Sequence, residues 1–378
     1  MCGNSYKIGV SVNNIILGAG VTGLAAGFKT GFPIYEATDV CGGICRSYYR
    51  DKYRFERGGG HWLFGPEDII DFVKKYGAFD RYNRNAGVYF NQIMPYPIQT
   101  QFADDYLPNK GTLEDWLYAK FGPVMCKFFF WPFNDKYTDG LMPHIIQDDP
   151  KKSPLGHAKG YNDRFYYPRE GLDVFVDRLS RDSVINYNKQ AVAIDLEKHI
   201  VFFQDAEQVK YDRLISTIPL NQMMQICNIE GCDLPYTSVL VLNMGARVGT
   251  NMPKEHWLYL PGKEPFFRVG FYSNVEQSFA PEGRVSLYVE RAFKEKVDFG
   301  TYKQDTSRVL KNWGWIGEVE TLDANWIEVA YTWLTRESKR KEYLAILEDY
   351  EVCSIGRYGK WKFQGIAESI EDGLGVVL

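Results

Sequence analysis

The sequence NIILGAGVTG at residues 14–23 decides the fold of this chain. Its apolar run Asn14–Leu17 predicts a buried strand, and Leu24–Thr30 beyond the glycines predicts the start of a helix. The segment Phe32–Glu36 predicts the next strand. Strand, glycine-rich turn, helix and strand in this order open a parallel nucleotide-binding unit. We therefore predict an α/β fold that contains a Rossmann-type domain.

The glycines of the turn follow the pattern Gly-x-Gly-x-x-Gly at Gly18, Gly20 and Gly23. Glycines at these positions let the backbone approach a pyrophosphate, whose charge is stabilised by the N-terminus of the following helix. Glu36 ends the second predicted strand, 18 residues after Gly18, and its carboxylate can accept hydrogen bonds from a ribose diol. Together these features favour a bound dinucleotide over a purely structural turn.

A second glycine motif, CGGICR, follows at residues 41–46. Gly-Gly-x-x-Arg after an acid-tipped strand is typical of FAD-binding proteins of the amine-oxidase and glutathione-reductase type, so Gly43 and Arg46 predict FAD rather than NAD. Cys41 and Cys45 lack the Cys-x-x-Cys spacing of a redox pair, and we expect inert thiols.

A third run of glycines ends at His61. Gly59 and Gly60 would let the backbone lie flat against a flavin ring, because neither residue has a side chain. His61 would then lie beside that ring, although a lone histidine can equally be a structural group.

Composition and charge exclude several classes of protein. The chain has 378 residues, 45% hydrophobic and 24% charged, which excludes disordered, collagen-like and coiled-coil proteins. Its net charge of −4 argues against a nucleic-acid partner. No apolar run approaches the roughly 18 residues of a membrane helix, and no signal peptide is evident. An odd cysteine count of seven predicts no disulfide framework. We expect a cytoplasmic protein without a metal site.

The remaining patterns predict a chain with inserted elements. Helices are expected at 67–82, 112–130, 172–179 and 337–350, a loop at 144–162, a short strand at 214–218, and antiparallel strands within 184–203 and 237–292. The predicted FAD-binding domain comprises 1–66 and continues around 165–182, 205–220 and 345–378. A mainly helical insert is expected at 67–150, and an antiparallel-sheet substrate domain at 183–204 and 221–344.

Several segments in a fixed order resemble one known family. They are Gly59–His61, Trp131–Tyr137, Phe165–Gly171, Ser216–Pro219, Trp257–Pro261, Pro265–Arg268, Ser273–Asn274 and Gly356–Trp361. In this order, from about Asn14 to the C-terminus, the chain resembles the UDP-galactopyranose mutases, which lie within the flavin amine-oxidase-like superfamily. The segments are closer to the eukaryotic branch.

The resemblance implies a specific reaction. That family interconverts the pyranose and furanose forms of a nucleotide sugar through a covalent adduct between reduced FAD and the sugar. It implies UDP-galactose as substrate, with UDP-arabinose or another nucleotide left open. It also implies NADPH or NADH as reductant for some members, and dimers or tetramers.

The resemblance also implies roles for particular residues. Arg169 and Arg268 would hold the diphosphate from two sides, because guanidinium groups bind phosphate oxygens bidentately. His61 would lie against the flavin, and Arg357 near it would stabilise the anionic reduced form. Further cofactor positions are Asp372, Gly373 and Leu374, at the start of the last FAD-contacting helix, and further substrate positions are Tyr167, Asn274 and Phe363.

The chain departs from the family pattern where phosphate-binding tyrosines are expected. Val275 and Phe363 replace two of them, and a Gly-Tyr-Pro segment has no counterpart near Tyr331–Glu342. The chain also ends soon after Gly373, so we expect the family's final helix to be shortened. Either other groups bind the diphosphate or the substrate differs. Three hypotheses follow: a flavin-dependent mutase acting on a nucleotide sugar, an FAD-dependent oxidoreductase of the amine-oxidase type, and an FAD-binding descendant without activity. The paired arginines favour the mutase.

Overall fold

The predicted glycine turn lies in the middle of a parallel sheet. In the computed structural model, which describes residues 13–98, 111–147 and 163–377, β1 (Asn14–Leu17) leads into α1 (Val21–Thr30) and then β2 (Ile34–Tyr35). The five strands lie in the order β19-β13-β1-β2-β9 and are all parallel. The added strands are β9 (Ile185–Asn186), β13 (Arg213–Ser216) and β19 (Val352–Ser354). This confirms the predicted strand, turn, helix and strand.

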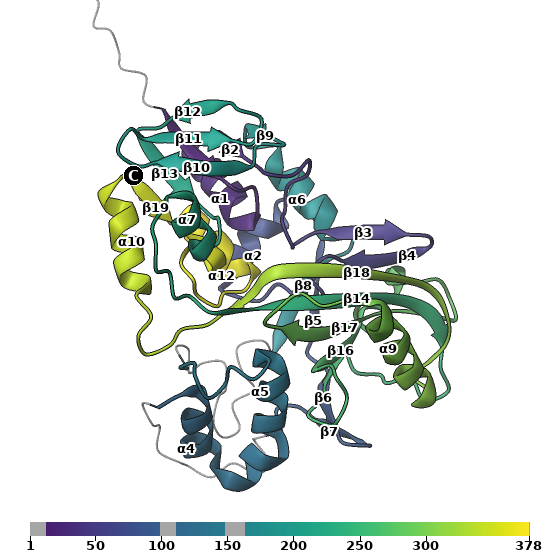
Figure 1. The fold of residues 1–378 in the computed structure, drawn as a ribbon. Coiled ribbons are helices and arrows are strands. Elements are labelled where there is room, and N and C mark those ends of the chain that lie inside the picture. Colours follow the sequence, from purple (N-terminus) through teal and green to yellow (C-terminus); the bar gives the residue numbers. More distant parts are fainter. Residues whose placement is uncertain (1–12, 99–110, 148–162, 378) are drawn as a thin grey trace, which may run out of the picture.

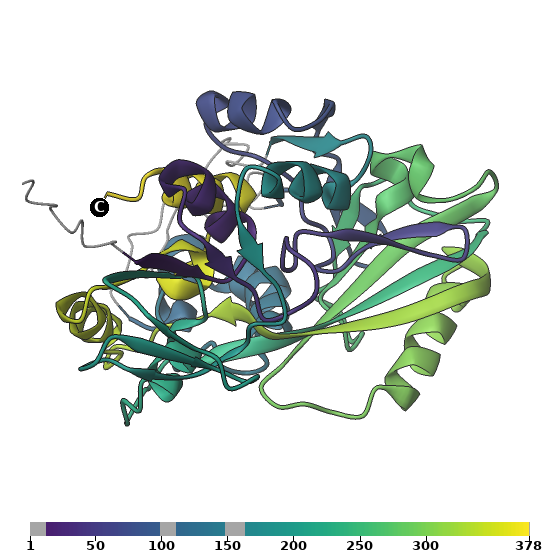
Figure 2. The ribbon, with the colours of Figure 1, turned by 90° about the horizontal axis from the view of Figure 1, so that it is seen from above.

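Both faces of this sheet are covered, which is why Ile15, Ile16 and Leu17 of β1 are all apolar. Side chains alternate along a strand, so Ile16 packs on one side with α1, α6 (Leu172–Ser180) and α12 (Ile366–Leu374). Ile15 and Leu17 pack on the other side. That side is formed by an antiparallel sheet of β10 (Ala191–Asp195), β11 (Ile200–Phe203) and β12 (Gln208–Lys210), with α7 (Leu220–Ile226) and α10 (Arg340–Asp349) (Figure 2).

A larger sheet extends away from the parallel one (Figure 1). Its seven strands lie in the order β18-β14-β17-β16-β15-β6-β7, antiparallel except for the pair β15 and β6. They are β6 (Ala86–Tyr89), β7 (Ile93–Pro95), β14 (Tyr236–Val248), β15 (Trp257–Tyr259), β16 (Arg268–Phe271), β17 (Arg284–Phe293) and β18 (Ile316–Thr332). One face packs with α9 (Gly300–Asn312). The hairpin of β3 (Ser47–Arg50) and β4 (Tyr53–Glu56) also contacts this sheet.

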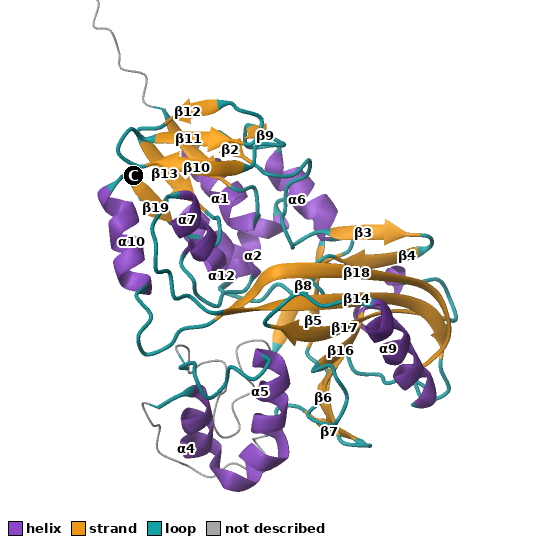
Figure 3. Cartoon of the chain, in the orientation of Figure 1, coloured by secondary structure: helices purple, strands orange, loops and turns teal. Residues whose placement is uncertain are grey.

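Three consecutive helices form a separate lobe below the two sheets in Figures 1 and 3. They are α4 (Leu113–Met125), the π-helix η1 (Cys126–Phe130) and α5 (Trp131–Thr138). Thr112 caps α4 through a capping box with Asp115. Gly122 has φ of 72° and precedes Pro123, and the helix kinks there. The remaining short elements are α2 (Glu67–Lys74), β5 (Phe79–Asn83), β8 (Arg164–Pro168), α8 (Tyr272–Val275), η3 (Gln277–Phe279) and α11 (Gly356–Gly359).

Two of the sequence expectations are wrong in detail. The helix expected over 67–82 ends at Lys74, because Phe79–Asn83 instead pairs with β8. Residues 183–204, which were expected in the antiparallel-sheet domain, contribute no strand to the seven-stranded sheet. Instead β9 joins the parallel sheet, and β10 and β11 cover one face of the parallel sheet. In both cases pairing with a strand distant in sequence overrides the local pattern. The insert at 67–150 contains α2, α4, η1 and α5, and it also contributes β6 and β7 to the large sheet. The expected loop at 144–162 lies outside the described residues from 148 onwards.

Other expectations can be compared with the described residues directly. Within them, none of the helices combines the length and apolarity needed to cross a membrane. Across residues 13–98, 111–147 and 163–377 no cluster of histidine, cysteine and carboxylate side chains could hold a metal ion. The six described cysteines are free, and burial raises the pKa of Cys45 to about 12. A thiol with so high a pKa is inert at neutral pH, as expected for Cys45.

Candidate active site

A cavity of about 360 Å³ opens where the parallel sheet, the large sheet and the helical lobe meet. One arm is lined by glycines of the first turns, at Gly20, Gly42, Gly58 and Gly60. The other arm enters the helical lobe and is lined by apolar and aromatic side chains, which are Leu113, Leu117, Phe129, Phe130 and Phe133. Charged and polar groups lie between the two arms.

The glycine-lined arm contains the N-terminus of α1. Gly20 lies at its N-cap position, and no described side chain caps it, so the first backbone N–H groups of the helix have no side-chain acceptor. Gly18 has φ of 95°, and a Cβ at Gly23 would lie 1.9 Å from the carbonyl oxygen of Gly18. The tight turn therefore requires glycine at both positions. Such an arrangement is suited to an anion at the helix N-terminus.

Glu36 and Arg46 hold in place the loops that form the glycine-lined arm. Glu36 Oε2 accepts a hydrogen bond from the Ala19 N–H at 2.7 Å, and Oε1 accepts from the Thr38 N–H and hydroxyl at 2.9 Å. Glu36 thus holds the glycine turn, and neither it nor Arg46 is among the cavity-lining residues. Arg46 pairs with Asp177 of α6 at 2.7 Å, which attaches the loop around Gly43 to that helix.

His61 lies in the wall between the two arms. A Cβ at Gly58 would lie 2.2 Å from His61 Cε1, so the ring packs directly on the Gly58 backbone. Burial, together with the positive charge of Arg357, lowers the pKa of His61 to about 4, and the imidazole is neutral at pH 7. Its Nδ1 atom is buried without a hydrogen-bond partner among the described residues.

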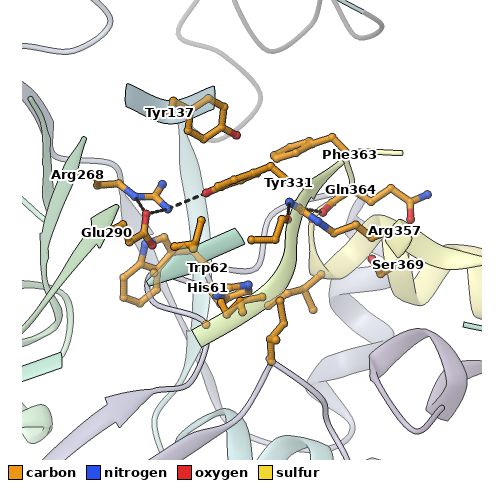
Figure 4. A pocket seen from close by; sticks show the side chains of 18 of the residues that line it. His61, Trp62, Tyr137, Arg268, Glu290, Tyr331, Arg357, Phe363, Gln364 and Ser369 are labelled. Carbon is orange, nitrogen blue, oxygen red and sulfur yellow. Dashed lines mark hydrogen bonds and ion pairs between the residues drawn. The ribbon is translucent and has the colours of Figure 1, made fainter. Parts of the chain in front are cut away.

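Arg268 projects into the centre of the cavity from the start of β16 (Figure 4). It lies opposite Glu290 in the register of β16 and β17, and its Nε donates to Glu290 Oε2 at 2.6 Å. Glu290 is only 2% exposed, whereas Arg268 retains 21% of its side-chain exposure. Its Nη2 also lies 3.5 Å from the Tyr331 hydroxyl. Burial raises the pKa of Glu290, and the nearby guanidinium opposes that shift.

Arg357 lies on the opposite side of Tyr331 in Figure 4. Its terminal nitrogens donate to the backbone oxygens of Gln364 at 2.7 Å and Ala330 at 2.9 Å, and its guanidinium lies 4.5 Å from the Phe363 ring centroid. Its Nε is buried without a partner among the described residues. A fixed positive charge beside the glycine-lined arm favours an anionic group there.

The structure does not bring Arg169 and Arg268 together. Arg169 follows β8, its side chain is 65% exposed, and Nε pairs with Asp80 Oδ2 at 2.5 Å. Arg169 is not among the cavity-lining residues. The expectation of two opposed arginines failed because β8 pairs with β5, which directs this residue to the outer surface beside Asp80.

Other predicted residues also lie outside the cavity wall. Tyr167 is fully buried and donates to Glu56, and Asn274 Nδ2 donates to the backbone oxygens of Pro253 and Glu255 at 2.9 and 2.7 Å. Both side chains stabilise the fold. Asp372, Gly373 and Leu374 end α12 rather than starting it, because the helix begins at Ile366. Gly373 instead allows close packing on α1, since a Cβ there would lie 2.4 Å from the Thr22 oxygen.

The cavity contains aromatic residues that the sequence analysis did not assign a role. They are Tyr96, Tyr137, Tyr259, Tyr331 and Trp333, of which Tyr331 and Trp333 lie together at the end of β18. Tyr137 and Tyr331 lie 4.4 Å apart by ring centroid, next to Arg268 in Figure 4. Hydroxyl groups are therefore present around Arg268, although two family tyrosines are replaced. Tyr137 and Tyr259 lie within segments that carry the resemblance, which was the available signal.

Comparison with solved structures extends over nearly the whole chain. A crystal structure of reduced UDP-galactopyranose mutase shares 21% identity, covering 97% of this chain and 93% of that chain, with a TM-score of 0.86. A putative protoporphyrinogen oxidase from Exiguobacterium sp. 255-15 shares 15% identity over 96% and 97% of the two chains, with a TM-score of 0.74. A putrescine oxidase redesigned in its cofactor binding shares 13% identity over 96% and 97%, with a TM-score of 0.67. No family model matches the sequence. The chain therefore has the mixed α/β fold that these three proteins share.

Proposed function

We propose that this chain is a flavin-dependent isomerase that interconverts the pyranose and furanose forms of a nucleotide sugar such as UDP-galactose or UDP-arabinose. The main support for this proposal is the position of Arg268, whose guanidinium lies at the centre of the cavity beside the Tyr331 hydroxyl. The likeness in fold to UDP-galactopyranose mutase supports the same conclusion. A diphosphate is the natural partner of a partly exposed guanidinium in an otherwise enclosed site.

The residues of the glycine-lined arm fit FAD. The uncapped N-terminus of α1 would bind the pyrophosphate, Glu36 would keep the glycine turn in place for it, and Gly60 and His61 would lie beside the flavin ring. The empty space around Gly20, where a Cβ would meet nothing within 4 Å, is consistent with a ligand at this point. In its reduced form, FAD supplies the nucleophilic nitrogen that the ring isomerisation requires.

Arg268 would act on the leaving group. Glu290 Oε2 holds both Nε and Nη2 of Arg268, so Nη1 is the nitrogen that would bind a diphosphate oxygen. As the bond between the anomeric carbon and UDP breaks, negative charge grows on the diphosphate, and a preorganised cation stabilises it. The Tyr331 hydroxyl is protonated, because burial raises its pKa to about 12, and it can donate a further hydrogen bond.

A second candidate is an FAD-dependent oxidoreductase. The apolar and aromatic wall in the helical lobe would suit an apolar amine or ring, and Arg169 lies outside the cavity. Such a substrate needs no diphosphate site, so Arg268 would be dispensable for its binding.

Anaerobic turnover distinguishes the two candidates. We would reduce the FAD-loaded protein with dithionite, add UDP-galactopyranose and UDP-arabinopyranose separately, and separate the products by chromatography. Furanose product in the reduced sample, with none in the oxidised control, is expected for the isomerase. Peroxide formed from amines by the oxidised protein, without furanose product, would establish the oxidoreductase instead.

A further inference from the structure

Lys136 of α5 lies outside the cavity wall yet makes an unusual set of contacts. Its Nζ donates to the backbone oxygens of Gly262 at 3.1 Å, Glu264 at 3.1 Å and Phe266 at 3.0 Å. An ammonium group has three N–H donors, so these three carbonyls use its full capacity. The side chain is half-buried, and burial lowers its pKa to about 8.

The three acceptors belong to the loop between β15 and β16. This loop ends at Phe267, and the next residue in the chain is Arg268. The carbonyl of Phe266 is therefore two residues from the guanidinium-bearing position. A loop of this kind needs hydrogen-bond partners for its carbonyls, and here a single side chain provides them.

The same helix also contacts the cavity side of this loop. Tyr137, next to Lys136, packs its ring edge-on against Phe267 with centroids 5.3 Å apart and lies 4.4 Å from Tyr331. At the end of α5, Asp139 Oδ2 accepts from the Lys294 N–H at 2.9 Å, just beyond β17. The helical lobe is thus attached to both strands that contribute Arg268 and Glu290.

We propose that Lys136 is a positioning residue that holds Arg268 in place by fixing the β15–β16 loop against α5. This inference rests on the proposed role of Arg268 in binding a diphosphate. Without the ammonium group, three carbonyls lose their shared donor and residues 262–266 lose this attachment to α5. The guanidinium would then spend less time in the arrangement that Glu290 and Tyr331 define, and a diphosphate would bind more weakly.

The variant Lys136→Met tests the proposal in the FAD-loaded protein. The side chain keeps its approximate length and loses its three donors. Lys189→Met is the matched control, because Lys189 is also mostly buried, at 18% exposure, but pairs with Asp205 and Glu207 at the β11–β12 turn. Lys136→Arg is a second variant, which keeps the charge but cannot place one nitrogen among three converging carbonyls.

Two readouts separate positioning from general destabilisation. We expect Lys136→Met to raise the dissociation constant of UDP roughly tenfold by calorimetry, with Lys136→Arg intermediate, while FAD content stays constant. We also expect faster amide hydrogen exchange over residues 262–268. Lys189→Met should leave both unchanged. Unchanged exchange in Lys136→Met, or faster exchange with unchanged UDP affinity, overturns the proposal.

Failure of the proposed function gives a different result. If the parent protein binds no UDP, the diphosphate role of Arg268 is wrong, and a crystal structure of Lys136→Met then decides the positioning role. Displacement of the Arg268 guanidinium from Glu290 in that structure would uphold the positioning role. An Arg268 that stays paired with Glu290 in its original place would overturn it.

Discussion

Replacing Arg268 by methionine should separate its contribution to stability from its contribution to substrate binding. The guanidinium neutralises Glu290, whose side chain is 2% exposed. Removing one partner of a buried ion pair leaves the other charge uncompensated, which costs about 3–5 kcal/mol. The buried carboxyl would bind a proton in response, because burial already raises its pKa. We therefore expect Arg268→Met to fold with reduced stability.

The double variant Arg268→Met with Glu290→Gln isolates the effect on binding. Neither replacement leaves a buried charge, so most of the lost free energy of unfolding should return. The diphosphate contact is still missing, and a charge-assisted hydrogen bond is worth about 1.5–3 kcal/mol. That range corresponds to a loss of roughly 10- to 150-fold in kcat/KM for a nucleotide sugar.

Urea unfolding and anaerobic turnover measure the two effects separately. Unfolding would be followed for the parent, Arg268→Met, Glu290→Gln and the double variant, each loaded with FAD. Turnover would be followed in dithionite-reduced protein with UDP-galactopyranose or UDP-arabinopyranose, whichever the parent converts. If the double variant kept kcat/KM within twofold of the parent, our assignment of Arg268 to the leaving group would be refuted.

Three further predictions concern the turn, a buried acid and a tyrosine. Gly23→Ala places a Cβ 1.9 Å from the Gly18 oxygen, so the turn must open. We expect this variant to lose FAD, measured as flavin absorbance per protein, and full FAD content would contradict the prediction. Burial raises the pKa of Glu56 to about 8, whereas the unfolded carboxyl loses its proton near its ordinary value of 4.5. Because the folded state then binds more protons, the free energy of unfolding should fall as pH rises from 5 to about 8. Glu56→Gln should lose this pH dependence in urea titrations. Equal pH dependence in the parent and the variant would refute the raised pKa of Glu56. Tyr331→Phe removes the hydroxyl 3.5 Å from Arg268 and should weaken UDP binding about tenfold by calorimetry at constant FAD content, and unchanged affinity would exclude a contact with the diphosphate.

The accuracy of the sequence predictions follows the range of the interactions involved. Thr112 and Asp115 form a capping box within four residues, and the helix that follows was predicted correctly at its start. The helix expected over 67–82 failed beyond Lys74, because Phe79–Asn83 pairs with a strand more than 80 residues away in the chain. Apolar periodicity reports which side chains are buried, and it does not identify the segment that buries them.

The accuracy of the site predictions also depends on the range of the interactions. Glycine patterns identified the turns at Gly18–Gly23 and Gly58–Gly60, because the left-handed conformation of Gly18 and Gly59 is a local backbone property. The side chains that pack on Gly59 and Gly60, Glu290 and Tyr288, come from a distant segment. Motif order also led to Arg268, which lines the cavity. The same reasoning predicted Arg169 as the partner of Arg268, yet the pairing of β5 with β8 and the ion pair with Asp80 place it on the surface.

The sequence by itself determined the strand, turn, helix and strand of the first unit and the α/β class, because glycine conformation, helix hydrogen bonding and apolar periodicity are properties of residues close together in the chain. Tertiary structure alone decided the chemistry at the centre of the cavity. The register of β16 with β17 pairs Arg268 with Glu290, and β18 and α5 bring Tyr331 and Tyr137 beside them. These contacts depend on strand register and on helix packing between segments far apart in the chain, which no pattern within one segment specifies.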